Sequence, residues 1–242
     1  MNPHYGRATI IAAVLLPMLF LTAFYILGNA INWPNSLNGN AAEYLPLVAA
    51  HADEVRIGYS FYFAACVMHA LIAVLLTIHL GAHRRPGLAI AALLGVLAGA
   101  FKMLGIARWL EAMPGIAGAM AADASAATIS YEALNDYAGV TLGEGLGVGL
   151  FTGLWFGAVA LAAGASAEGD DAGLPMWLRG LFGITSAFSL AGFLGLYGAE
   201  VDALGMITGN LQYFSFWFLA GALVWRIRGE QLQIPRTPSP AG

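Results

Sequence analysis

Charged residues are scarce in this sequence. Asp, Glu, Lys and Arg make up 10% of its 242 residues, whereas hydrophobic residues make up 59%. Soluble globular chains carry roughly 45–50% apolar and about 25% charged residues. The shortage of charge therefore excludes a soluble globular protein. The net charge is −4 and there is no basic block, so we expect no nucleic-acid partner.

Cysteine is almost absent as well, because Cys66 is the only one. A single cysteine excludes a disulfide framework and a cysteine zinc site. The chain also lacks the G-x-S-x-G and H-E-x-x-H motifs of hydrolases and metalloproteases. Closely spaced carboxylate–histidine clusters, which a di-iron or copper site would need, are missing too. We therefore expect no metal site and no enzymatic activity.

Long apolar runs are abundant. A helix needs about 20 apolar residues to cross a bilayer, and the backbone facing lipid must form its hydrogen bonds within its own segment. We expect an all-α, polytopic membrane protein in which residues 1–228 form one bundle and 229–242 form a disordered cytoplasmic tail. The six transmembrane helices are predicted at 8–31, 57–82, 87–110, 137–164, 177–199 and 207–227.

The basic residues predict the orientation of the bundle. Cytoplasmic loops carry an excess of Lys and Arg. With six spans, both termini share one side with the loops around 83–86 and 165–176, and the other side holds only Arg56 and Arg108. We expect both termini in the cytoplasm and the protein in a bacterial inner membrane. The arginines on the cytoplasmic side are Arg7, Arg84, Arg85, Arg179, Arg226, Arg228 and Arg236.

Two longer loops lie on the outer side, at 32–56 and 111–136. The stretch "NAAEYLPLVAAHADEVRIG" mixes apolar and acidic residues, which favours a short helix at the membrane interface. The stretch "DASAATISYEALNDYAG" begins with Asp and Ser cap candidates, which predict a short helix leading into the fourth span. Pro114 predicts that the third helix does not continue past it.

Charged residues inside the spans are the main site candidates. Lys102 lies about 9 Å deeper in the membrane than Arg108, and Glu144 reaches a similar depth on the next span. Such residues are costly in lipid and face partners in the bundle interior. We expect Glu144 to pair with Lys102 or Arg108, and the three-residue spacing of Arg108 and Glu111 allows a second pair.

The expected cluster of Lys102, Arg108, Glu111 and Glu144 has two readings. A buried pair can simply hold the helices in register, or it can form a polar pocket or a proton- or ion-linked site. Further polar residues, Glu200, Asp202 and Asn210, lie around the outer turn between the fifth and sixth spans. They are secondary candidates for the same outer cluster.

Glycines repeat every four residues along the fourth span. One series is Gly139, Gly143 and Gly147, and the other is Gly145, Gly149, Gly153 and Gly157. Small residues at this spacing let helix backbones approach closely. We expect these glycines to serve either packing within the monomer or a homodimer through the fourth span.

His69 lies near the middle of the second span and is another secondary candidate. A haem held across the bundle would need a second axial ligand, and no other span supplies a histidine. We therefore expect a packed or hydrogen-bonded histidine and no cofactor.

Two stretches, "LGIARWLEAMPGIA" and "YAGVTLGEGLGVGLFTGLWF", carry a family resemblance. The chain resembles a bacterial family of six-span membrane proteins that is known only as a domain of unknown function. Its shared features are an Arg-Trp with a following Pro in the third span, and a Gly-Glu-x-Leu-Gly pattern in the fourth. Here these match Arg108, Trp109 and Pro114, and Gly143, Glu144, Leu146 and Gly147. The resemblance implies a fold and an Arg–Glu pair, and no activity.

These observations favour a non-enzymatic membrane protein. It would act as a sensor, regulator or accessory subunit with a polar pocket open to the outer face, in contact with lipid and with another membrane protein or a second copy. The alternative is a small transporter or proton-linked carrier that uses Glu144 with Arg108 or Lys102. A membrane enzyme or haem protein is a third reading.

Overall fold

The computed structural model describes residues 3–37, 39–164, 173–195 and 202–232, and all of its regular structure is helical. The predicted all-α fold is confirmed. The helices are α1 (Pro3–Ile31), α2 (Ala41–Ala50), α3 (Ala52–His79), α4 (Pro86–Leu110), α5 (Ala112–Ala119), α6 (Ala124–Leu134), α7 (Thr152–Ala162), α8 (Met176–Gly195) and α9 (Asp202–Leu232), with short turns η1 (Asn35–Leu37) and η2 (Ala82–Arg84) and a π-helix, η3 (Asn135–Phe151).

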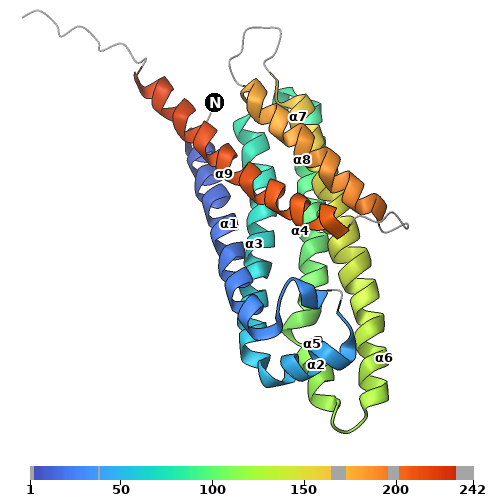
Figure 1. Cartoon of the computed structure of the whole chain (residues 1–242). Helices are drawn as coiled ribbons and strands as arrows, with labels where there is room; N and C mark the ends of the chain where they lie inside the picture. The colour runs from blue at the N-terminus through green and yellow to red at the C-terminus, as the bar shows by residue number, and fades with distance from the viewer. Residues whose placement is uncertain (1–2, 38, 165–172, 196–201, 233–242) are drawn as a thin grey trace, which may run out of the picture.

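The long helices form an elongated bundle (Figure 1). α1 packs against α3, α3 against α4, and α4 against the continuous segment η3–α7. α8 and α9 pack over one end of this bundle, where α8 contacts α7 and α9 contacts α1. The short helices α2, α5 and α6 gather at the opposite end. The core runs along the bundle axis and contains aromatic side chains such as Trp109, Trp155 and Phe216.

Five helical segments among the described residues are long and apolar enough to cross a membrane. They are His4–Ile31, Ala52–His79, Pro86–Ala119, Ala124–Ala162 and Met176–Leu194. These coincide with the first five predicted spans, so a multi-pass membrane protein is confirmed. The sixth predicted span, 207–227, lies within α9, which is helical as expected but is less apolar than the other five because it carries residues such as Asn210 and Gln212.

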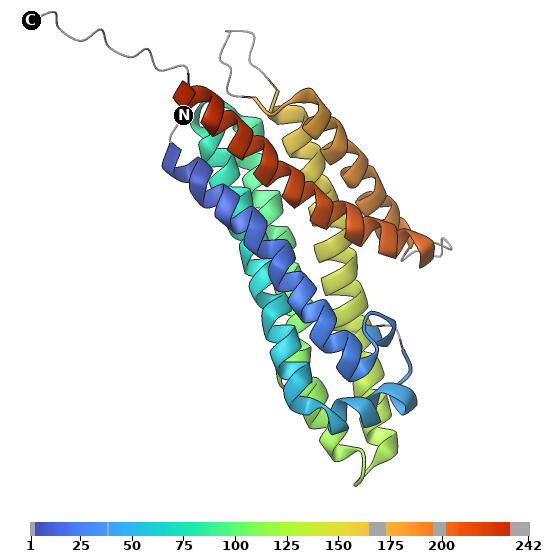
Figure 2. The same ribbon diagram turned by 60° about the vertical axis from the view of Figure 1, so that its left-hand side comes forward.

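The N-terminal end of α1 and the C-terminal end of α9 lie at the same end of the bundle (Figure 2). The junction between α3 and α4 lies at this end too, whereas α2, α5 and α6 lie at the other. This arrangement places the two termini as the six-span threading expects.

The third span breaks earlier than Pro114. α4 ends at Leu110, and Glu111 takes an extended φ of −135° before α5 begins at Ala112. The helix therefore does not continue past Pro114, and it ends at the predicted residue, 110. Pro114 lies in the first turn of α5, where proline is tolerated because those N–H groups have no intrahelical acceptor.

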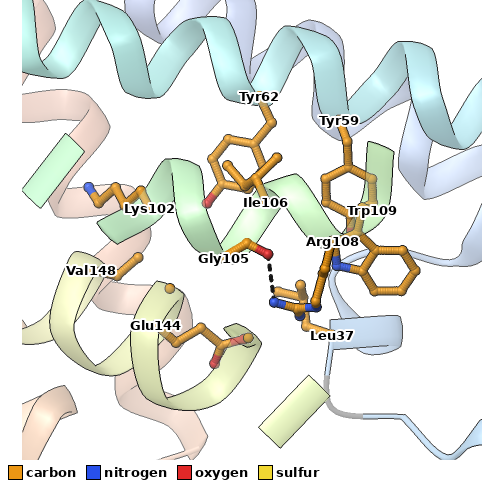
Figure 3. A pocket seen from close by; sticks show the side chains of 12 residues that line it. Leu37, Tyr59, Tyr62, Lys102, Gly105, Ile106, Arg108, Trp109, Glu144 and Val148 are labelled. Carbon is orange, nitrogen blue, oxygen red and sulfur yellow. Dashed lines mark hydrogen bonds between the residues drawn. The ribbon is translucent and has the colours of Figure 1, made fainter. Parts of the chain in front are cut away.

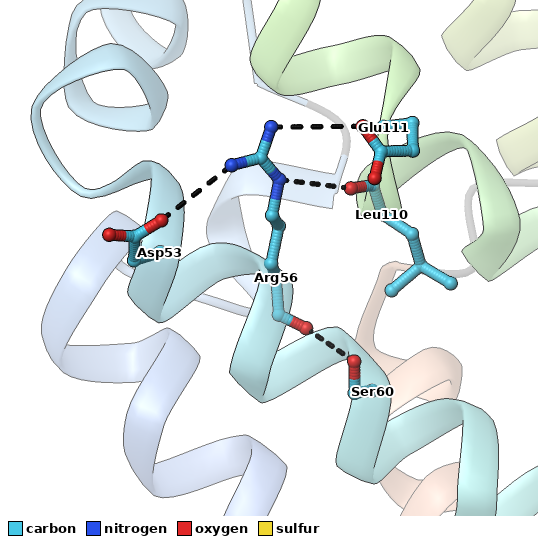
Figure 4. Close-up of polar contacts among 5 residues, drawn as sticks. All are labelled: Asp53, Arg56, Ser60, Leu110 and Glu111. Atoms are coloured by element: carbon cyan, nitrogen blue, oxygen red, sulfur yellow. Dashed lines mark hydrogen bonds and ion pairs between the residues drawn. The ribbon is translucent and has the colours of Figure 1, made fainter.

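Arg56 of α3 holds this break (Figure 4). Its Nε donates to the carbonyl oxygen of Leu110 at 3.2 Å, one of the acceptors that a helix end leaves open. Its other guanidinium nitrogens lie 3.6 Å from Asp53 and 3.7 Å from Glu111. The two carboxylates are largely exposed, so this ion-pair network adds little stability.

Both predicted outer helices are present. α2 begins after Asn40, whose side chain accepts from the N–H of Glu43 at 2.9 Å. α6 begins after Asp123, whose carboxylate accepts from the N–H of Ala126 at 2.9 Å. Each cap satisfies one of the open donors of the first helical turn, as the sequence pattern predicted for α6.

The glycine series of the fourth span lie mainly in η3. In a π-helix each hydrogen bond reaches five residues along the chain, which widens the turn and keeps residues four apart nearly on one face. Thr141 and Thr152 follow this spacing, since their hydroxyls donate to the carbonyls of Asp136 and Gly147, five residues earlier. The depth expected for Glu144 assumed an α-helical rise and therefore does not apply over 135–151.

The two series face different neighbours. A methyl group at Gly149, Gly153 or Gly157 would come within 2.8 Å of α8, at Phe193, Leu190 and Ser186 respectively. Gly145 is buried. The Ser186 hydroxyl also donates to the carbonyl of Gly153 at 2.8 Å. Gly149, Gly153 and Gly157 thus pack against α8 within one chain.

The other series packs on α4. A methyl group at Gly105 would lie 2.6 Å from Cα of Gly143, so the two backbones meet here without side chains between them. Gly139 lies against the guanidinium of Arg108, and Gly147 against the backbone of Lys102. The close approach of η3 and α4 is what places the charged residues of the third and fourth spans together.

Candidate functional site

Two adjoining cavities lie between α3, α4 and the helices packed on them. Both are small and partly open, with cavity volumes of about 40 Å³ for the first and about 10 Å³ for the second. Tyr62 and Lys102 border both. The polar and aromatic residues that line the first cavity are Tyr59, Tyr62, Lys102, Arg108, Trp109 and Glu144 (Figure 3).

The guanidinium of Arg108, in the first cavity, forms two hydrogen bonds. One terminal nitrogen donates to the carbonyl of Gly105 at 2.7 Å, and the other donates to Oδ1 of Asn135 at 2.9 Å. Asn135 in turn donates to the carbonyl of Leu37 at 3.0 Å. These bonds fix the guanidinium plane, which lies 5.5 Å from the centre of the Trp109 ring. Gly139 is needed opposite, because any side chain there would strike the guanidinium.

Glu144 faces Arg108 from η3, on the other side of the first cavity (Figure 3). The sequence predicted a pair between Glu144 and Arg108 or Lys102. The structure brings all three residues to one cavity, while the hydrogen bonds of the two cations go to neutral partners. Three of the four residues of the expected cluster thus line one cavity, and the pairing of Glu144 with one of the cations stays a prediction.

Lys102 points away from Arg108, toward the second cavity (Figure 3). Its Nζ lies 3.3 Å from Nδ1 of His69 and donates to Oε1 of Gln212 at 3.3 Å. Gln212 also donates to the carbonyl of Val148 at 3.2 Å and to Oγ of Ser189 at 3.0 Å. One amide side chain of α9 therefore joins α4, η3 and α8.

His69 is buried, as expected for a packed histidine, and its ring contacts two aromatic rings besides Lys102. The ring centres of Trp155 and Phe216 lie 4.8 Å and 5.3 Å away. In the described part of the chain, no three His, Cys, Asp or Glu residues come close enough to hold a metal ion. The surroundings of His69 are those of a hydrogen-bonded core residue beside an amine.

Other candidates lie elsewhere. Glu111 does not join the cluster, because its side chain is 86% exposed and its ion pair is with Arg56; the break after Leu110 turns it off the face that carries Arg108. Asn210 is exposed and lines neither cavity. Glu200 lies outside the described residues, and of Asp202 only the backbone is described, as the first residue of α9.

Four residues of the site were not singled out from the sequence. Gln212 lies two positions from Asn210, which on a helix is nearly the opposite face, and it reaches the interior in place of Asn210. Asn135 donates to Leu37 and accepts from Arg108 at the start of η3, and Tyr59 and Tyr62 come from α3. A polar residue inside a membrane span was the available signal for Gln212, whereas tyrosines near a span end are common and carry no such signal.

The fold and these cavities define a multi-pass α-helical membrane protein with charged groups buried inside its bundle. The chain belongs to the family described as "Domain of unknown function (DUF4386)", which matches residues 11–225. The predicted membership of a family of unknown function is thereby confirmed. No curated protein and no solved structure matches the chain.

Proposed function

We propose that this protein binds a small polar ligand in the first cavity and acts, without catalysing a reaction, as a sensor, regulator or accessory subunit of a bacterial inner membrane. The observation that carries the proposal is the gathering of Arg108, Glu144 and Lys102 around one cavity in a chain of which only 10% is charged. Ionisable groups at membrane depth are costly and mark ligand or ion sites.

The position of the cavity supports access from the outer face. α8 has 20 residues and is therefore about 30 Å long, which is the thickness of the hydrocarbon core. Its two ends therefore lie near the two surfaces of that core. Its C-terminal part contacts η3 at Gly149. Glu144 precedes Gly149 in η3 and so lies nearer to α6, which ends where η3 begins. The arginine distribution makes the α6 end of the bundle the outer one.

The test is thermal unfolding of the detergent-purified protein with a panel of small polar compounds. A ligand that binds only the folded state raises stability by about 2.7 kcal/mol at a hundred times its Kd. We expect at least one compound to raise the melting temperature of the wild type and of Glu132→Gln, an exposed control on α6, but to have a smaller effect on Glu144→Gln. Equal shifts in all three proteins would contradict the proposal.

A proton-linked carrier is the second candidate, and one contact favours it. Lys102 borders both cavities and contacts His69, so ionisable groups continue from Glu144 toward the middle of the second span. A carrier would acidify or alkalinise proteoliposomes when solute is added, and Glu144→Gln would abolish this signal. Some solutes will raise the melting temperature of the protein. If none of them changes the internal pH of the proteoliposomes, the result favours the sensor or accessory role.

An accessory role also needs a partner, either another membrane protein or a second copy. Because the Gly149–Gly153–Gly157 face packs on α8, the partner would contact another lipid-facing surface of the bundle. Crosslinking in native membranes, followed by mass determination of the crosslinked species, distinguishes a homodimer from a complex with a different chain.

A further inference from the structure

Three hydrogen-bond donors on one wall of the first cavity have no acceptor. In the described residues, Nε of Arg108, the hydroxyl of Tyr59 and Nε1 of Trp109 are buried and make no hydrogen bond. Most buried polar groups in proteins have a partner, and each exception needs a reason. Other buried atoms of the described residues also lack a partner, but these three belong to neighbouring residues that all line the first cavity, which points to a ligand that supplies the acceptors.

The three groups are held as one rigid unit. The rings of Tyr59 and Trp109 stack with their centres 4.8 Å apart and an angle of 8° between the planes. Arg108 lies over the same indole, and two of its nitrogens are fixed by Gly105 and Asn135. The side chains of Tyr59 and Trp109 are 1% exposed and that of Arg108 is 7% exposed. The donors are therefore preorganised, and little conformational entropy is lost when they bind.

We propose that this wall, formed by Tyr59, Arg108 and Trp109, binds the carboxylate of a small organic acid. The inference rests on the proposed function and names the chemical class of its ligand. A carboxylate offers two oxygens, with about four acceptor sites in total, so it can satisfy several donors at once and bring the negative charge that a buried guanidinium attracts.

The position of Glu144 restricts the chemical class of the ligand further. Its carboxylate lines the same cavity from the η3 side, so a ligand with a second negative charge would be repelled there. A monocarboxylate avoids this repulsion, and one with an amino group, such as an α-amino acid, would place a positive charge near Glu144. On the same ground we expect a dicarboxylate of similar size to bind more weakly than a monocarboxylate.

The first experiment needs no ligand. Tyr59→Phe removes a buried hydroxyl that has no partner, so the melting temperature of the ligand-free protein should stay unchanged or rise. Tyr131→Phe is the matched control, because the Tyr131 hydroxyl donates to the carbonyls of Ser36 and Gly39 at 3.4 Å each, and its loss should lower the melting temperature. A drop in Tyr59→Phe as large as in Tyr131→Phe would overturn the inference, since it would show that the Tyr59 hydroxyl is already bonded.

The second experiment measures binding. Acetate, benzoate, glycine and alanine are compared with their primary amides and with glutarate, at constant ionic strength, by thermal shift of wild type, Tyr59→Phe and Tyr131→Phe. We expect at least one monocarboxylate to stabilise the wild type and Tyr131→Phe, and its affinity to fall about tenfold in Tyr59→Phe, the loss of one hydrogen bond to a charged group. The matching amide and glutarate should bind weakly or not at all.

The possible failures are distinguishable. If amines, which are cations near neutral pH, or neutral compounds stabilise the wild type in a Glu144-dependent way while no monocarboxylate does, the ligand site stands and the carboxylate assignment is wrong. If a monocarboxylate binds with the same affinity to Tyr59→Phe, it binds away from this wall, and the inference is also wrong. If neither these acids nor the wider panel stabilises the protein, the proposed function fails together with the inference.

Discussion

At the scale of single residues, the buried charges of this protein are held by neutral groups. Arg108 donates to a backbone carbonyl and to an asparagine, and Lys102 contacts a histidine and a glutamine. Neutral partners satisfy the hydrogen bonds of a cation but do not cancel its charge. Keeping such cations inside the bundle costs stability, which is the expectation for residues kept for a function.

Asn135 tests how Arg108 is held. Asn135→Ala removes the acceptor of one guanidinium nitrogen and the donor to the Leu37 carbonyl, so we expect a loss of about 2–3 kcal/mol in the free energy of unfolding. The measurement is denaturant or thermal unfolding in detergent. Asn29→Ala is the control, because the exposed Asn29 makes one bond within its own helix and should change stability by less than about 0.5 kcal/mol. Equal effects would mean that Arg108 does not depend on Asn135.

Lys102 is the only lysine of the chain, and it tests the cost of a buried charge. Lys102→Met keeps the length of the side chain and removes the amine, so we expect an unchanged or higher melting temperature. Gln212 keeps its bonds to Val148 and Ser189 in this variant. A fall of more than about 2 kcal/mol in stability would instead show that the contact of Lys102 with His69 and Gln212 is a structural link between the helices.

At the scale of elements, the site depends on how closely η3 approaches α4. Gly105 and Gly143 meet backbone to backbone, and the π-helical segment carries the Gly139–Gly143–Gly147 series along this contact. Unusual helical turns of this kind occur often at functional sites. The first cavity is bordered by this contact, so the glycines shape it although only a few of them line it.

Gly105→Ala tests this contact. Its methyl group would lie 2.6 Å from Cα of Gly143, and neither backbone can move without moving a helix. We therefore expect the free energy of unfolding to fall by about 1–3 kcal/mol or more. Gly183→Ala in α8 is the control, because a methyl group there has no atom within 4 Å, and alanine favours a helix over glycine by about 1 kcal/mol. The measurement is the melting temperature of Gly105→Ala and of Gly183→Ala. Similar values for the two variants would show that η3 and α4 are not in close contact.

At the scale of the whole molecule, the threading through the membrane decides which side the cavity faces. The α3–α4 junction lies with the termini at one end of the bundle, and α6 lies at the other. The exposed positions His83 and Ile129 mark these two ends.

Cysteine labelling tests the orientation. In a Cys66→Ser background, a membrane-impermeant maleimide should label Ile129→Cys in intact cells and His83→Cys only after permeabilisation, because the positive side is cytoplasmic. Labelling of both variants in permeabilised membranes is the control for reactivity. The reverse pattern in intact cells would place the first cavity on the cytoplasmic side and exclude an extracellular or periplasmic ligand.

Much of the fold was predictable because each span satisfies its own backbone. Five predicted spans coincide with apolar helices, and the Asp123 cap marks the start of α6. The end of α4 at Leu110 was predicted, but the contact of Arg56 from another helix with the Leu110 carbonyl was not. Such a contact between distant parts of the chain leaves no local sequence signal.

The sequence by itself determined that this is a membrane-embedded helical bundle and that Lys102, Arg108 and Glu144 belong to its interior, because hydrocarbon tolerates neither open backbone groups nor unsheltered charges. Only the tertiary structure decided which residues meet them. The partners Asn135, Gln212 and His69 come from three other elements, and the stack of Tyr59 on Trp109 forms between α3 and α4. Their positions follow from helix rotation and from backbone contact at glycines, which depend on the packing of the whole bundle.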